Sequence, residues 1–118
     1  MNQENLTLHP KMFQLFKQVE IELKKLLGDK LKKVILFGSY SRGDYDNESD
    51  VDMIALVDEP RPDETYEDII LDLVVDLSLE YDVLLSLFLK NEGEYEKAKN
   101  SKPLLRNIEK EGIEVYAA

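Results

Sequence analysis

Two aspartates two positions apart, Asp50 and Asp52, have the clearest capacity for chemistry in this chain. They begin an apolar run, DVDMIALV, that is typical of a β-strand. Alternate residues of a strand point to the same face, so the two carboxylates lie about 7 Å apart along the backbone and can share a cation. Burying two like charges together is costly unless a cation compensates, and oxygen ligands without His or Cys favour Mg²⁺ or Mn²⁺. The pair therefore predicts a divalent-metal site.

A second group of residues, before the aspartates, is suited to binding phosphate. Gly38 and Ser39 follow the apolar run KVILF and predict a tight turn into a short helical segment. Backbone N–H groups that approach an anion, a Ser hydroxyl and a helix N-terminus all favour phosphate. Arg42 adds a permanently charged donor for the same phosphates, and Gly43 keeps the backbone there adaptable.

A calcium-binding loop is a competing interpretation of this acidic stretch, because acids alternate from Asp44 to Asp52. Counted from Asp44, however, position six is Ser49 instead of Gly and position twelve is Ala55 instead of Glu. The sharp turn and the bidentate ligand of an EF-hand are therefore missing.

The whole motif, Gly-Ser, ten residues and then Asp-x-Asp with Ser-Arg-Gly inside it, resembles the signature of a known superfamily. It is similar to the DNA polymerase β-like nucleotidyltransferases, specifically the minimal nucleotidyltransferase (MNT) domains, over about residues 34–116. The resemblance implies a small palm-like fold in which an acceptor hydroxyl attacks the α-phosphorus of a nucleoside triphosphate and releases pyrophosphate.

The resemblance also implies roles for individual residues. Asp50 and Asp52 would bind two Mg²⁺ ions and be catalytic, whereas Gly38, Ser39, Arg42 and Ser49 would bind the nucleotide, with ATP as the substrate. These roles agree with the chemistry of the residues, since two-metal catalysis needs closely spaced carboxylates and developing charge needs donors.

A third carboxylate completes the metal site in the superfamily and comes from a later strand. In the strand predicted at residues 82–90, Asp82 is the only acid among the alternate residues Asp82, Leu84, Ser86 and Phe88. It is therefore the candidate third metal ligand and catalytic acid, although relatives align their acid more naturally with Leu84. Asp82 could equally be a boundary residue between a helix and a strand, in which case turnover would be slow or absent.

Small acidic MNT domains resemble the antitoxin half of pairs with HEPN-type ribonuclease toxins, and some transfer AMP from ATP to a tyrosine of the toxin. The resemblance thus implies an antitoxin with a HEPN-type partner. The alternative is a non-catalytic, MNT-like antitoxin that neutralises its partner by binding alone. Four acids at i, i+4 spacing (Asp68, Asp72, Asp76 and Glu80) form an acidic ridge that either aids solubility or meets a basic partner.

The elements that must position these residues follow from hydrophobic periodicity. Helices are predicted at residues 11–27, 66–81, 92–99 and 103–110, and strands at 33–37, 50–57, 83–89 and 113–116, with a loop at 59–64. This order predicts an α/β (α+β) class with a small mixed β-sheet and helices packed mainly on one face. With 118 residues, a single domain spanning 1–118 is expected.

The composition narrows the classes of function. The chain has no cysteine and one histidine, which excludes thiol catalysis and multi-histidine metal cages. Its net charge of −10 argues against tight binding to long nucleic acid. Without a run of apolar residues long enough for a membrane span, a soluble cytoplasmic protein is expected. Because the chain is short for an enzyme that must recognise both nucleotide and acceptor, the partner or a second copy in a homo-oligomer could supply acceptor contacts.

Overall fold

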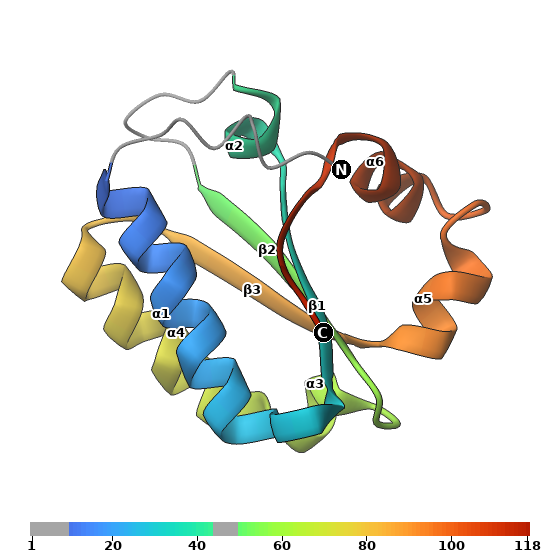
Figure 1. The fold of residues 1–118 in the computed structure, drawn as a ribbon, viewed down its shortest axis with the longest axis horizontal. Coiled ribbons are helices and arrows are strands. Elements are labelled where there is room, and N and C mark those ends of the chain that lie inside the picture. The colour runs from blue at the N-terminus through green and yellow to red at the C-terminus, as the bar shows by residue number, and fades with distance from the viewer. Residues whose placement is uncertain (1–9, 44–49) are drawn as a thin grey trace.

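In the part of the chain that the structure describes, four strands form one mixed sheet in the order β3-β2-β1-β4 (Figure 1). The computed structural model describes residues 10–43 and 50–118. Strand β1 pairs antiparallel with both β2 and β4, whereas β2 and β3 run parallel. The strands are β1 (Leu31–Phe37), β2 (Val51–Val57), β3 (Leu85–Asn91) and β4 (Ile113–Ala117). The helices are α1 (Pro10–Leu27), η2 (Gly28–Lys30), α2 (Ser39–Arg42), α3 (Pro62–Thr65), α4 (Glu67–Tyr81), α5 (Glu92–Ala98) and α6 (Pro103–Glu111).

The two longest helices, α1 and α4, lie side by side on one face of the sheet, and α5 and α6 lie on the other (Figure 1). Helix α1 buries an apolar stripe at helical spacing, which is why residues 11–27 were recognisable as a helix. That stripe consists of Met12, Leu15, Phe16, Val19, Leu23 and Leu27. The predicted α/β class with a small mixed sheet is confirmed. The helices cover both faces instead of mainly one, because the chain after β3 crosses to the other face as α5 and α6 (Figure 1).

The side chains of β2 point alternately to the two faces of the sheet, and this alternation decides on which face Asp52 lies. Met53 and Ala55 belong to the larger core cluster, under α1 and α4, whereas Ile54 and Leu56 belong to the smaller cluster, under α5 and α6. Because side chains alternate along a strand, Asp52 is on the same face as Ile54. The metal-binding candidate therefore faces the side of the sheet that carries α5 and α6.

Two local differences from the sequence prediction have physical causes. The predicted loop at residues 59–64 contains the start of α3, because Pro62 occupies the first turn of that helix, where its missing N–H costs nothing. Strand β3 begins at Leu85 instead of residue 83, and Asp82 ends α4 with a left-handed backbone conformation at φ 52°. Asp82 is consequently not a strand residue.

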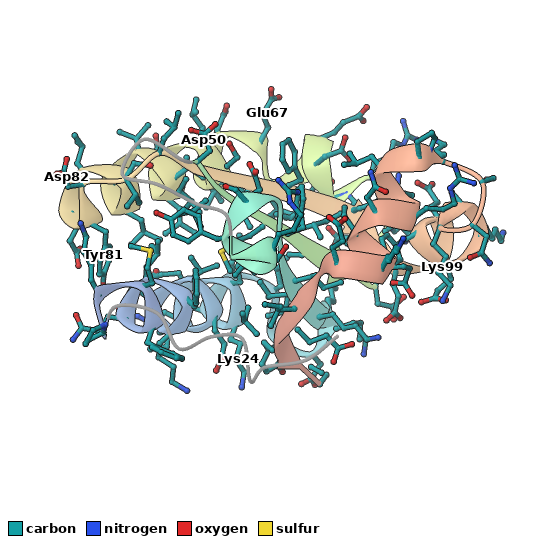
Figure 2. The ribbon with its side chains drawn as sticks, turned by 90° about the horizontal axis from the view of Figure 1, so that it is seen from above. Lys24, Asp50, Glu67, Tyr81, Asp82 and Lys99 are labelled. Atoms are coloured by element: carbon teal, nitrogen blue, oxygen red, sulfur yellow. The ribbon has the colours of Figure 1, made fainter. Side chains whose placement is uncertain are left out.

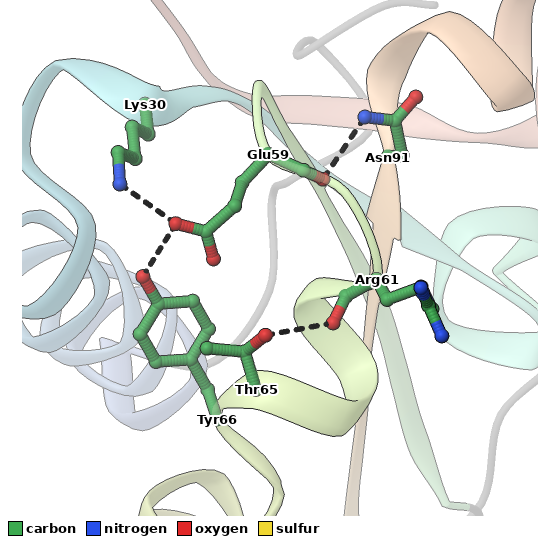
Figure 3. A network of polar contacts seen from close by, with 6 residues as sticks. All are labelled: Lys30, Glu59, Arg61, Thr65, Tyr66 and Asn91. Carbon is green, nitrogen blue, oxygen red and sulfur yellow. Dashed lines mark hydrogen bonds and ion pairs between the residues drawn. The ribbon is translucent and has the colours of Figure 1, made fainter.

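Glu59 anchors the connection between β2 and α3 (Figure 3). Its Oε1 accepts a hydrogen bond from Lys30 Nζ at 2.7 Å and another from the Tyr66 hydroxyl at 3.0 Å. Its carbonyl oxygen accepts a bond from Asn91 Nδ2 at 2.9 Å, at the junction of β3 and α5. The bond from Lys30 is the main reason that the pKa of Glu59 is lowered. The connection is thereby fixed to both the sheet and α4.

The predicted acidic ridge of α4 is exposed at all four positions, Asp68, Asp72, Asp76 and Glu80. An exposed apolar stripe, made of Leu71, Val75 and Leu79, runs beside it on the same helix. None of the helices in residues 10–43 and 50–118 combines the length and the apolarity needed to cross a membrane.

Candidate functional site

An open pocket of about 510 Å³ lies where β1 ends and β2 begins. Three separate stretches of the sequence meet there: the end of β1 with the corner leading into α2, the start of β2, and helix α6. The lining residues are Phe37, Gly38, Ser39, Arg42, Asp50, Asp52, Leu104, Asn107, Ile108 and Glu111. Three of the predicted nucleotide-binding residues, Gly38, Ser39 and Arg42, thus share one cavity with both aspartates.

Gly38 forms the corner between β1 and α2, and only glycine suits the position. Its φ is +75°, and a Cβ added to it would lie 2.6 Å from Oδ2 of Asp52. The carbonyl oxygen of Gly38 accepts bonds from the N–H groups of Ser41 at 3.1 Å and Arg42 at 3.2 Å, and from the Ser41 hydroxyl at 2.8 Å. The missing side chain lets the corner pass directly over the Asp52 carboxylate.

Asp52 is opposite Phe37 on β1 and opposite Ser86 on β3. Its pKa is raised, first by burial and then by the charge of Asp50, whereas the charge of Arg42 opposes the shift. Asp50, just before β2, is exposed and lines the same pocket. Two carboxylates whose charges disfavour each other in a partly buried place fit a hard divalent cation, which would relieve both the burial cost and the repulsion.

Arg42, at the end of α2, lines the pocket and reaches the C-terminal end of α6. Its Nη1 lies 3.5 Å from Oε2 of Glu111, and its charge also acts on Asp52. The guanidinium therefore lies near acidic side chains, and a bound phosphate could take the place of Glu111 as its partner.

Helix α6 adds Asn107 and Glu111 to the pocket, and the sequence analysis missed both. The periodicity of residues 103–110 indicated a helix but carried no information about which end of the sheet that helix would cover. An acid and an amide in its last two turns were therefore indistinguishable from ordinary surface residues.

The structure does not bring Asp82 together with Asp50 and Asp52. Asp82 is exposed at the C-terminal end of α4 and does not line the pocket; Figure 2 labels it at that end of the helix, with Asp50 closer to the middle of the molecule. Among residues 10–43 and 50–118, no three His, Cys, Asp or Glu side chains are grouped closely enough to hold a metal ion. The prediction that Asp82 is a third metal ligand is thus not supported by the geometry, because the residue caps a helix instead of entering β3.

The strand positions next to Asp50 and Asp52 are not acidic. Ser86 is opposite Asp52, and the carbonyl oxygen of Leu84 accepts a bond from the N–H of Val51 at 2.9 Å. Leu84 is thus beside the start of β2, where the resemblance leads one to expect an acid. Ser49, the remaining predicted nucleotide-binding residue, lies outside the described residues.

Comparison with known proteins places this geometry in context. A family model described as "Nucleotidyltransferase domain" matches residues 16–115. A protein of Methanocaldococcus jannaschii named "Putative protein adenylyltransferase" is 38% identical over 104 residues, which cover 88% of this chain and 98% of that protein.

Two solved structures share the fold. A chain of a toxin-antitoxin crystal structure with AMP-PNP is 21% identical, with a TM-score of 0.58, and the match covers 86% of this chain and 73% of that one. A chain of the complex between a tri-AMPylated Shewanella oneidensis HEPN toxin and its MNT antitoxin is 20% identical, with a TM-score of 0.53, over 90% and 73% of the two chains.

Proposed function

The chain belongs to the nucleotidyltransferase domain family, and from that premise we propose that it transfers AMP from ATP to an acceptor hydroxyl in a Mg²⁺-dependent reaction. The observation that carries the proposal is the shared pocket, where the Gly38–Ser39 corner, Arg42 and the two aspartates meet. We propose a tyrosine of a HEPN-type toxin as the acceptor, so that the protein acts as an antitoxin in the cytoplasm. The name of the Methanocaldococcus relative and the toxin-antitoxin neighbours support this choice.

Each residue of the pocket has a distinct task in this proposal. Gly38 and Ser39 bind the triphosphate, with the Ser39 hydroxyl as a donor, and Arg42 neutralises phosphate charge. Asp50 and Asp52 hold Mg²⁺, which when bound lowers the cost of negative charge on the α-phosphate. Two ions remain the expectation for the loaded site, with Ser49 as a further nucleotide contact.

The reaction is a single displacement at the α-phosphorus. The acceptor oxygen forms a bond to that phosphorus, and the bond to the oxygen bridging the α- and β-phosphates breaks. Pyrophosphate leaves from the Gly38–Ser39 side, and the hydroxyl proton passes to solvent. Arg42 and the donors of the corner stabilise the leaving group as its charge grows.

A second candidate function is neutralisation by binding alone. The observation that favours it is the lack of a third acid grouped with Asp50 and Asp52 in the part of the chain that the structure describes. In that case the exposed acidic ridge of α4 would meet a basic surface of the partner, and nucleotide chemistry would be dispensable.

Labelled ATP separates the two functions. Purified protein and a candidate HEPN-type partner are incubated with Mg²⁺ and ATP labelled at either the α- or the γ-phosphate. AMP transfer puts the α-label on the partner and leaves the γ-label in pyrophosphate, whereas phosphoryl transfer would put the γ-label on the partner and leave the α-label in ADP. A stable complex with no label from either ATP would support the binding-only alternative instead.

Glu111→Gln is expected to lower the KM for ATP by up to about fivefold, because an exposed ion pair contributes at most roughly 1 kcal/mol and Arg42 no longer has to leave it to meet phosphate. The measurement is the initial rate of transfer against ATP concentration. Glu20→Gln is the matched control, since Glu20 also pairs at 3.5 Å with a basic residue, Lys17, but on α1. An unchanged or higher KM in Glu111→Gln would contradict competition between Glu111 and phosphate.

A further inference from the structure

A second pocket of about 410 Å³ adjoins the first and is lined by none of the residues proposed to bind the triphosphate or the metal. Phe37, Leu104 and Ile108 line both pockets, so the two cavities share a wall. The second pocket extends over the α5/α6 face of the sheet toward the end of β3, where Phe88 and Leu89 line it. It therefore begins directly beside the proposed reaction site.

Two aromatic rings stand over β2 at this junction. Phe37 on β1 is opposite Asp52, whereas Phe88 on β3 is opposite Ile54, two residues further along β2. Their ring centroids are 6.4 Å apart, with the planes inclined by 37°. Because two residues of a strand span about 7 Å, Phe88 lies about that far along the sheet from the level of Asp52.

Phe88 and Leu104 are unusually exposed for large apolar residues that line a cavity. Their exposed fractions are 53% and 59%, respectively. An exposed ring beside a second ring favours a further planar aromatic group, because aromatic pairs gain from offset-stacked or edge-to-face contact beyond the burial of area. The wall of the pocket is thus suited to an aromatic guest.

The in-line geometry of the proposed reaction indicates which aromatic group would bind in the second pocket. The attacking and leaving oxygens are roughly in line in phosphoryl-type transfer. The proposed leaving group is held at the Gly38–Ser39 corner, which follows β1, whereas β3 lies on the other side of β2. An acceptor opposite the leaving group must therefore approach from the side of β3, where Phe88 lies.

We propose that the second pocket binds the aromatic ring of the acceptor tyrosine, with Phe88 and Phe37 as its contacts, so that the phenolic oxygen points toward Asp52. This inference rests on the proposed function and assigns its acceptor subsite. The Glu59 anchor keeps the neighbouring β2–α3 connection in place, and that connection supplies Arg61 and Pro62 to the far side of the pocket.

Phe88→Ala tests the subsite, with Leu84→Ala as the matched control. Both residues are large, exposed apolar side chains, Phe88 in β3 and Leu84 immediately before it, but Leu84 does not line the pocket. Phe88→Ala is expected to raise the KM for a tyrosine-containing acceptor about tenfold and to leave the Kd of Mg²⁺ and AMP-PNP within twofold of the wild type. Phe88→Tyr, which keeps the ring, should restore the acceptor KM.

The converse result would overturn the proposal. A tenfold weaker binding of AMP-PNP in Phe88→Ala with an unchanged acceptor KM would assign the pocket to the nucleobase, and equal effects of Phe88→Ala and Leu84→Ala would remove any special role of the ring.

An NMR titration makes the test independent of turnover. N-acetyl-tyrosinamide should shift the ring resonances of Phe37 and Phe88, whereas N-acetyl-serinamide should not, and Phe88→Ala should lose the effect on Phe37. A positive titration in a protein that transfers no label would defeat the proposed function while retaining the aromatic subsite. No shift of either ring would defeat the subsite itself.

Discussion

Asp52→Asn is expected to lower the rate of AMP transfer about a thousandfold or more, while the metal-free protein stays at least as stable as the wild type. The variant removes a carboxylate that we propose to hold Mg²⁺, and metal stabilisation of the transferring phosphoryl group amounts to several kcal/mol. The same change removes a carboxyl group whose pKa is raised by burial and by the charge of Asp50, which means that its ionised form is unfavourable in the folded protein. Activity and stability should therefore respond in opposite directions, as measured by label transfer and by thermal unfolding in chelator.

Mg²⁺ supplies the control within this experiment. A ligand that binds only the folded state raises its stability, so Mg²⁺ with AMP-PNP should raise the Tm of the wild type but not of Asp52→Asn. Asp82→Asn is the matched variant, because Asp82 is exposed, and asparagine tolerates its left-handed backbone. It should keep activity within about threefold of the wild type; a large loss would restore Asp82 as a catalytic acid.

The pH dependence follows from the sign of the Asp52 shift. A raised pKa means that the folded state binds this proton more tightly than the unfolded state does. Its contribution to stability is therefore present at low pH and is lost as the pH rises from the ordinary carboxyl range through the raised pKa. Metal-free Asp52→Asn should lack this decrease, which denaturant unfolding at a series of pH values would measure.

Gly38→Ala is expected to lower transfer about a hundredfold and to destabilise the fold by about 1–2 kcal/mol. The left-handed backbone at φ +75° is costly for a residue with a Cβ, and the added carbon would lie 2.6 Å from Oδ2 of Asp52. Either the corner or the carboxylate must move, and a displacement of about 1 Å at a reacting centre can cost a hundredfold in rate. Initial rates and denaturant unfolding measure the two effects.

Gly28→Ala separates backbone strain from displacement of the carboxylate. Gly28 also has a left-handed backbone, at φ +56°, but a Cβ there would meet nothing within 4 Å. Gly28→Ala should lower the free energy of unfolding by about as much as Gly38→Ala does, but its rate of transfer should stay within about twofold of the wild type. If Gly28→Ala and Gly38→Ala lost activity equally, the close approach of Gly38 to Asp52 would have no functional role.

The central part of the site could be predicted from local sequence. The two-residue spacing at the start of β2 brings Asp50 and Asp52 to one pocket, and a glycine after β1 marks the corner that brings Ser39 and Arg42 there too. These positions depend only on residues close in sequence and on one pair of adjacent strands. The periodicity and spacing of the sequence are therefore enough to predict them.

Tertiary packing decided the rest. Asn107 and Glu111 reach the pocket because α6 packs Leu105 and Ile108 against Ile35 and Ile54, a contact that no local pattern encodes. Asp82 lies outside the site because it ends α4 in a left-handed backbone conformation. The register between β2 and β3 puts Ser86, not an acid, opposite Asp52. The sequence by itself determined the chemical groups and the face on which two of them lie, since both follow from residue type and strand period. Which distant side chains join them depends on how helices and strands pack in three dimensions, and only the tertiary structure contains that information.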